Sequence, residues 1–435
     1  MTISSATELK NVLLSSIDFL LDHREEYLYH PETAFTRTKK ISFEKTILFP
    51  MIAGAGNLAT ELIDFFDEGS LPLPSAMIQR RNQVRSEAFR TLFAEFTGKL
   101  PVQKTYLGYQ LIACDGSRLN LPYNYSDKDT FSKNIEKRRG MNQIHLNCLY
   151  DILNDRFLEA SLHSVHKMNE KSAFCEFLGS QPARDPGQKK IFIADRGYPS
   201  YNVLAHVVHN GQLCILRASR KFIKDLCRNA LPLDDEPSFD KVLTFHFGRH
   251  QSKKYNQYEN YHYLKPKTRY DFLERGSDDV DRLQLRILKF PISEDSFEYI
   301  VTTLPAKAFS LDKIKELYNL RWNIETAYRH LKYAGNMVHI HSLKKEFLIQ
   351  EIYGKLTLYN FAAALMAINE SVQKKTDKYT YVLNHTQVQR ICIRFLRGSI
   401  QKVEEMIARF LVPVRPGRKF KRNLRRQSAD TLLYR

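Results

Sequence analysis

The sequence predicts an α/β fold in which helices flank a mixed β-sheet. Three observations support this prediction. The first hundred residues space their apolar side chains as helices do. From Thr105 onward, short apolar runs typical of strands alternate with helical segments. A stretch without glycine or proline, 311–333, then returns to helical spacing and predicts one long helix.

Charge and composition narrow the class of protein. The 435 residues include 66 Lys and Arg against 48 Asp and Glu, a formal net charge of +18. This excess of positive charge favours a polyanionic partner. Nucleic acid is the favoured partner, and an acidic membrane surface is the weaker alternative. None of the six cysteines forms a CxxC pair, and no window approaches 18 apolar residues. We therefore expect a cytoplasmic protein with no zinc ribbon, disulfide framework, signal peptide or membrane span.

Residues 1–104 are predicted to form a helical, basic, DNA-binding region. One helix carries QRR and a second begins at Ser86 after a polar break, an arrangement similar to a helix-turn-helix. Many helical hairpins with exposed arginines bind no DNA, so that alternative stays open. The basic side chains expected to contact DNA are Arg37, Lys39, Lys40, Arg80, Arg81 and Arg85.

Residues 105–219 are predicted to form the first part of the sheet. A first strand carries Asp115, and two strands joined by a hairpin at 151–155 follow. A helix then leads to a short apolar strand that ends at Asp195, followed by another helix and strand. This order, with acids on the first and fourth strands, is that of a ribonuclease-H-like sheet.

The remaining chain divides into three segments. Residues 220–304 read as successive strands and predict an all-β insertion. Residues 305–372 hold the long helix and a second, apolar helix that completes the core. Residues 373–435 are predicted to be helical with a basic tail, in which 415–426 has seven basic residues and no acid. Such a tail binds phosphates in a salt-dependent way.

Four polar side chains of the long helix share one face. At about 100° per residue, Tyr318, Arg321, Glu325 and Lys332 fall within a stripe roughly 60° wide. The simpler interpretation is an exposed face with an i, i+4 ion pair. The apolar residues form a separate stripe for the core, and the two upstream aspartates favour a functional role for the polar stripe.

The three acids Asp115, Asp195 and Glu325 are the candidate catalytic residues. Two strand-borne carboxylates and one helical carboxylate can converge on one or two Mg²⁺ ions, which prefer hard oxygen ligands. Two such ions activate the attacking oxygen and stabilise the leaving oxygen of an in-line phosphoryl transfer. Arg321 and Lys332 would then hold DNA phosphates, and Tyr318 would donate to the same backbone.

The spacing Tyr-x2-Arg-x3-Glu-x6-Lys, matched at all four positions, resembles that of DDE transposases of the insertion sequence four family. The segments LIACDGSRL and FIADRGYPSYN around the two aspartates are similar to those of the same family. The likeness covers roughly residues 35–370. It implies a ribonuclease-H-like core with a β-rich insertion, and Mg²⁺, replaceable by Mn²⁺, held by the three acids.

The resemblance also implies the reaction and the partners. It predicts cleavage of element ends and strand transfer into target DNA. The expected partners are double-stranded DNA, as terminal inverted repeats and as target, and a second copy of the chain; no membrane is involved. The protein would act at the bacterial nucleoid. Arg196, directly after the second acid, is a further candidate DNA contact.

One departure from the family concerns a hairpin intermediate. Members that form hairpins can stack a flipped base on a tryptophan of the β insertion. Here the only tryptophan is Trp322, within the helix, where it serves either as a core anchor or as a DNA contact. A Tyr or Phe of the insertion could stack the base instead. A nuclease without strand transfer, and a DNA-binding protein without catalysis, remain the alternative functions.

Overall fold

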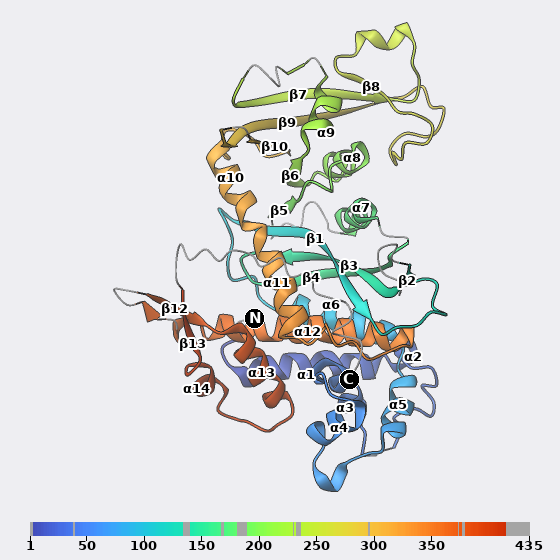
Figure 1. Ribbon diagram of the computed structural model, residues 1–435, viewed down its shortest axis with the longest axis vertical. Coiled ribbons are helices and arrows are strands. Elements are labelled where there is room, and N and C mark those ends of the chain that lie inside the picture. Colours follow the sequence, from blue (N-terminus) through green and yellow to red (C-terminus); the bar gives the residue numbers. More distant parts are fainter. Residues whose placement is uncertain are drawn as a thin grey trace.

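The computed structural model shows an elongated molecule built around one large sheet (Figure 1). Helices of the N-terminal region and α12 form a layer beneath the sheet, and β7–β9 lie at the opposite end. The structure describes residues 3–37, 40–133, 140–166, 169–180, 189–228, 230–231, 236–294, 296–372, 374–375 and 379–414. Among the helices within these ranges, none is long and apolar enough to cross a bilayer.

The first hundred residues are helical, as predicted. The helices are α1 (Ala6–Asp22), α2 (Arg24–Tyr27), α3 (Phe43–Ile52), α4 (Leu58–Phe65), α5 (Pro74–Asn82) and α6 (Ser86–Lys99), with a 3-10 turn η1 (Glu68–Ser70). Side chains of Ser5, Ser42 and Asn57 cap α1, α3 and α4 by accepting backbone N–H bonds. The core of this region continues into the sheet and α12, because Leu13 and Phe96 belong to the same apolar cluster as Leu146 and Ile352.

The sheet combines parallel and antiparallel strands. Its first part contains β1 (Tyr109–Leu121), β2 (Phe131–Ser132), β3 (Met141–Asp151), β4 (Arg156–Ser164), β5 (Lys189–Ala194) and β6 (Leu213–Ala218). β1, β5 and β6 run parallel, whereas β3 is antiparallel to β1, and both β2 and β4 are antiparallel to β3. This part of the sheet therefore runs β4–β3–β1–β5–β6, with the short β2 also paired to β3.

Alternate residues of the central strands enter two different cores. Leu111 and Ala113 of β1 pack with the N-terminal helices and α12, whereas Ile112 and Cys114 pack against α7 (Glu170–Ser180) and α8 (Tyr201–His209). This two-residue alternation follows from the pleat of a strand. It explains why the central strands read as continuous apolar runs, since both faces are covered.

The segment 220–304 is not all-β. It contains helix α9 (Arg220–Cys227), a 3-10 turn η2 (Lys253–Gln257), and strands β7 (Phe239–Gly248), β8 (Tyr261–Tyr263), β9 (Val280–Ser293) and β10 (Ser296–Thr302). Ser219 caps α9, a helix of eight residues in which Ile223, Leu226 and Cys227 are buried. The strands extend the main sheet in the order β6–β10–β9–β7–β8 rather than forming a separate one.

The stretch predicted as one helix forms two. α10 (Leu311–Leu320) and α11 (Trp322–Tyr333) meet at Arg321, whose N–H donates to the carbonyl of Tyr318 in a tighter, 3-10-type bond. Arg321 keeps right-handed helical dihedrals, so the direction of the chain is largely preserved. Figure 1 shows α10 and α11 running along the sheet from β10 to α12 (Lys345–Ile368).

The C-terminal region is only partly helical. It contains η3 (Glu370–Val372), α13 (His385–Leu396), α14 (Val403–Ile407) and a small sheet of β11 (Lys374–Lys375), β12 (Thr380–Leu383) and β13 (Leu411–Val414). In β13 the β-branched Val412 and Val414 favour a strand, and Pro413 opposes a helix. The basic tail after Val414, which was expected to bind phosphates, lies outside the described residues.

Candidate active site

Strands β1 and β5 bring two aspartates side by side. Cys114 of β1 pairs with Ala194 of β5, so the next residue on each parallel strand is an aspartate, Asp115 and Asp195. By the alternation of side chains, Asp115 follows Ala113 onto the face that carries α12. The two candidate acids are therefore neighbours although 79 residues separate them in the sequence.

Arg321, at the junction of α10 and α11, joins all three acids. Its Nη2 donates a hydrogen bond to Oε1 of Glu325 at 2.9 Å. The same nitrogen lies 3.9 Å from Oδ2 of Asp195, and Nη1 lies 4.0 Å from Oδ2 of Asp115. The guanidinium is buried, with a side chain only 3% exposed, whereas the acids are 23–38% exposed. The structure thus brings the three predicted acids together around one cation.

Two tyrosines fix the helices to the acid-bearing strands. The hydroxyl of Tyr318 donates to Oδ1 of Asp195 at 2.9 Å, and the hydroxyl of Tyr328 donates to the backbone carbonyl of Asp115 at 2.7 Å. Tyr318 was expected to face DNA, but it is buried and directed at the acid. Nothing in the sequence singles out Tyr328, because it belongs to the apolar stripe of α11.

Arg217 of β6 is a site residue that the sequence did not reveal. Its Nη1 lies 3.6 Å from Oδ1 of Asp195, and its Nε lies 2.8 Å from Oε1 of Glu298 in β10. The one available signal is a lone arginine in the otherwise apolar strand QLCILRA. Through this residue the second aspartate is linked to the strand that begins the extended half of the sheet.

The two aspartates differ in their affinity for protons. Burial raises the pKa of Asp115 to about 6, and Glu325 and Glu170 add to the effect while Arg321 opposes it. Burial also acts to raise the pKa of Asp195. The backbone N–H after it and its bonds to Arg321, Tyr318 and Arg217 outweigh burial, so this pKa lies below its usual value.

A pocket of about 300 Å³ opens beside Asp115 and Glu325. Arg329 and Lys332 of α11 also line it, so acids and bases share one hollow. Burial lowers the pKa of Lys332. Lys332 and Glu325 both line this pocket, which agrees with the expectation that they share one face of the helix. Asp195 is not among the lining residues.

The donor set of this site fits a hard divalent cation. Three carboxylates with partly exposed oxygens are the ligands that Mg²⁺ and Mn²⁺ prefer. Within the part of the chain that the structure describes, no three Asp, Glu, His or Cys side chains are grouped closely enough to hold an ion as they stand. In this arrangement Arg321 supplies the positive charge between the acids.

The other candidate DNA contacts are spread over the surface. Arg196 is exposed beside Asp195, and Trp322 is 48% exposed, so it is not a core anchor. Arg37 and Lys40 are exposed, and Lys39 lies outside the described residues.

Three N-terminal arginines have partners within the protein. Arg81 is buried, donates to Oε1 of Gln350 at 3.1 Å and pairs with Glu351, which argues against the expected DNA contact. Arg80 bonds Gln83 and stacks on a phenylalanine ring. Arg85 is exposed, but its Nε donates to the carbonyl of Leu28.

Comparison with known families agrees with this geometry. The family model described as "Transposase DDE domain" matches residues 106–361, more than half of the chain. The chain therefore belongs to the DDE transposases.

Two individual proteins are similar to this chain. The transposase InsG for insertion sequence element IS4 of Escherichia coli (strain K12) is 24% identical over 309 residues, which is 68% of this chain. The match spans 62% of the length of that relative. The piggyBac transposase in a synaptic complex with hairpin DNA is 10% identical with a TM-score of 0.47, covering 96% of this chain and 87% of the other.

Proposed function

We propose that this protein is a DNA transposase that cleaves the ends of an insertion sequence and joins them to target DNA with a divalent metal ion. The observation that carries the proposal is the gathering of Asp115, within β1, Asp195, directly after β5, and Glu325 around Arg321. The simpler interpretation, an exposed helix face with one ion pair, does not explain why three carboxylates from separate elements share one buried cation.

The strand order supports a ribonuclease-H-like core for this chemistry. The path β4–β3–β1–β5–β6, with β1, β5 and β6 parallel, has the first acid on the central strand and the second on its neighbour. In open α/β sheets, ligands bind outside the carboxyl ends of the strands. Asp195 follows the carboxyl end of β5, which agrees with this rule.

The three acids would hold Mg²⁺, for which Mn²⁺ can substitute. When bound, the metal activates the attacking oxygen and stabilises the leaving oxygen of phosphoryl transfer. Tyr318 orients Asp195 through its hydroxyl, which keeps that carboxylate ionised and aimed at the site. Arg321 neutralises the acids in the absence of DNA and is the group that a phosphate can draw away from them.

Lys332 and Arg329 give the pocket beside Asp115 a basic side that suits a backbone phosphate. The net charge of +18 favours double-stranded DNA, both the terminal repeats and the target, as the polyanion. We expect a homodimer on paired ends. Trp322, exposed next to Arg321, is available to stack on a base during a hairpin step.

The test is incubation of the purified protein with labelled element ends, with and without Mg²⁺, followed by a denaturing gel. We expect metal-dependent nicks at the ends, and the same gel separates hairpins from open products. A second reaction with pre-cut ends and target DNA distinguishes a transposase, which joins them, from a nuclease, which does not.

Asp195→Asn is expected to abolish end cleavage while end binding stays nearly intact, because the amide keeps the shape and loses the charge that holds the metal. Gel shifts measure binding and the denaturing gel measures cleavage. Asp225→Asn, on the exposed face of α9, is the matched control and should behave as the wild type. Undiminished cleavage by Asp195→Asn would remove this residue from the metal site.

A further inference from the structure

Glu170 lies close to both aspartate-bearing strands although it is outside the Tyr-x2-Arg-x3-Glu-x6-Lys motif. It is the first residue of α7, and its Oε1 is 3.2 Å from Nε2 of His145 in β3. A Cβ on Gly116, the residue after Asp115, would meet that same nitrogen at 2.3 Å. A Cβ on Gly197, two residues after the second aspartate, would be 3.6 Å from Oε2 of Glu170. The Glu170 carboxylate thus lies against the segment after the second aspartate, and its partner His145 lies against the residue after the first.

The polar groups around Glu170 are buried and incompletely paired. The side chains of His145 and Asn147 are almost fully buried, and Nε2 of His145 is 3.0 Å from Oδ1 of Asn147. Within the described structure, Nδ1 of His145 and Nδ2 of Asn147 have no hydrogen-bond partner. Buried polar atoms are normally paired in native proteins. Water molecules beside Glu170 would pair these two atoms, of which Nδ2 of Asn147 can only donate a hydrogen bond.

Glu170 also acts electrostatically on the site. Its charge is one of those that raise the pKa of Asp115, after burial and together with Glu325. Its side chain is one third exposed, so its second oxygen can still reach a ligand. Acids that crowd together in this way are stabilised by a shared cation.

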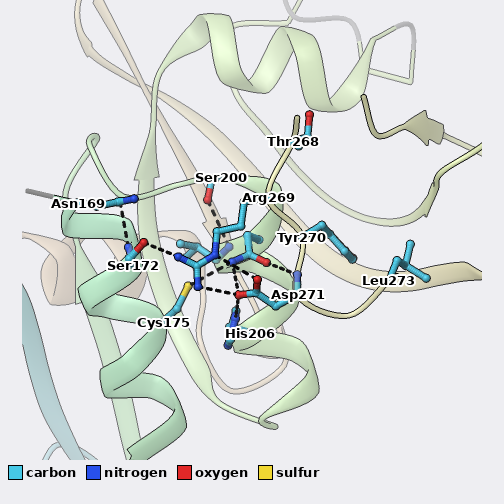
Figure 2. Close-up of polar contacts among 12 residues, drawn as sticks. Asn169, Ser172, Cys175, Ser200, His206, Thr268, Arg269, Tyr270, Asp271 and Leu273 are labelled. Carbon is cyan, nitrogen blue, oxygen red and sulfur yellow. Dashed lines mark hydrogen bonds and ion pairs between the residues drawn. The ribbon is translucent and has the colours of Figure 1, made fainter. Parts of the chain in front are cut away.

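The position of α7 is fixed by a loop from the extended half of the sheet. Figure 2 shows Arg269 of this loop directed at Ser172 in the first turn of α7, where Nη1 donates to Oγ at 2.6 Å. Arg269 also pairs with Asp271 through two hydrogen bonds. Asp271 in turn bonds Asn202 and His206 of α8. The helix that begins with Glu170 is therefore braced against two other elements and not left as a free end.

We propose that Glu170 is a fourth carboxylate of the metal site, contributing an oxygen to an ion shared with Asp115 and Asp195, and that His145 positions it. The proposal rests on the proposed function, since it assumes a divalent ion at the three acids. Mg²⁺ and Mn²⁺ accept six oxygen ligands, more than three monodentate carboxylates supply. The competing explanation is that Glu170 only pairs with His145 and favours the start of α7.

The test is a Mn²⁺ titration of the DNA-free protein, followed by the electron paramagnetic resonance signal of the free ion. We expect Glu170→Gln to weaken Mn²⁺ binding at least about tenfold, because even residues that only contact a metal ligand change the affinity by about 10–100-fold. Glu170→Asp keeps the charge and should retain more of the affinity. Glu176→Gln, on the exposed side of the same helix, should bind as the wild type does.

Thermal melts of the same variants separate a ligand from a structural acid. The proposal is overturned if Glu170→Gln binds Mn²⁺ as the wild type does. It is also overturned if binding falls only together with a loss of melting temperature that Glu170→Asp shares. Asp195→Asn in the same titration tests the proposed function itself: if that variant also binds normally, the three-acid site fails, whereas normal binding by Glu170→Gln alone removes only the fourth acid.

Discussion

Arg321 carries the charge balance of the site. Its guanidinium is the one group within 4.0 Å of a carboxylate oxygen of each of Asp115, Asp195 and Glu325 in the described structure. Its Nε, also buried, has no hydrogen-bond partner among the described residues. When DNA and a metal ion bind, we expect the metal ion to replace Arg321 as the partner of the three acids. The Arg321 guanidinium would then pair with a DNA phosphate.

Arg321→Ala is expected to lower the free energy of unfolding by about 1–3 kcal/mol in metal-free buffer. The loss is below that of a fully buried ion pair because the acids keep part of their exposure to water. Added Mn²⁺ should restore part of the stability by binding only the folded state. Urea unfolding with and without Mn²⁺ measures both effects, and Arg321→Lys, which keeps the charge, should lie between. An alanine variant as stable as the wild type would show that the acids need no counter-charge.

The raised pKa of Asp115 predicts a pH-dependent cost to folding. The Asp115 carboxyl has a pKa of about 6 in the folded state, against 3.8 for an unperturbed aspartate, so it binds its proton more tightly when folded. Its contribution therefore destabilises the fold increasingly as the pH rises from about 4 to 6 and fully above 6.

Asp115→Asn removes this cost. In metal-free buffer it should gain about 2–3 kcal/mol of stability at pH 7, with the gain vanishing below pH 4. Urea unfolding at several pH values measures the difference, and Asp18→Asn on the exposed face of α1 serves as the control. A gain that does not change between pH 4 and pH 7 would contradict the assignment.

At the scale of single residues, the sequence predicted the three acids but not the charged residues that lie next to them. Asp115, Asp195 and Glu325 could be found because strand ends and helix spacing leave a pattern. Arg217 and Glu170 could not, since each is one charged residue whose neighbours come from distant strands. Arg81 was expected to face DNA because the sequence does not tell which side of α5 meets α12.

At the scale of elements, α12 and α3 pack at unusually close range. A Cβ on Gly354 of α12 would lie 3.2 Å from the backbone N and Cα of Met51 in α3. Backbone atoms cannot turn aside as a flexible side chain can, so the two helices depend on this glycine for their separation.

Gly354→Ala is expected to destabilise the protein by about 1–2 kcal/mol, because forced separation of the helices outweighs the gain in helix propensity. Gly179→Ala in α7 is the matched control, since a Cβ there meets nothing within 4 Å. The control should be neutral or stabilising by about 0.5 kcal/mol. The melting temperatures of both variants measure the difference. Equal melting temperatures would mean that the contact between α3 and α12 has room for a methyl group.

Helices and strands were predicted well where a pattern ran long. The helices of the first hundred residues and the extent of 311–333 were recognisable, but the break at Arg321 was not, because no glycine or proline marks it. The break follows from tertiary contacts, in which the Arg321 side chain is held by acids of two strands. Helix α9 was missed because its eight residues are too few to show a clear helical repeat between strands.

At the scale of the whole molecule, positive charge is the property that DNA would meet first. Deleting residues 415–435, which include the seven basic residues of 415–426, should weaken binding to any DNA. Each lost phosphate contact should reduce the slope of log K against log salt by about 0.9. Fluorescence anisotropy at several salt concentrations measures the slope. An unchanged slope would show that the tail makes no phosphate contact.

The continuity of the sheet limits how this protein could be shortened. β10 pairs with β6 on one side and β9 on the other, so the segment between β6 and α10 is part of the main sheet. A shortened enzyme without that segment would leave the backbone N–H and C=O groups along one edge of β6 unpaired. Such an exposed edge strand promotes aggregation. Any trimmed version would need a substitute strand in the place of β10.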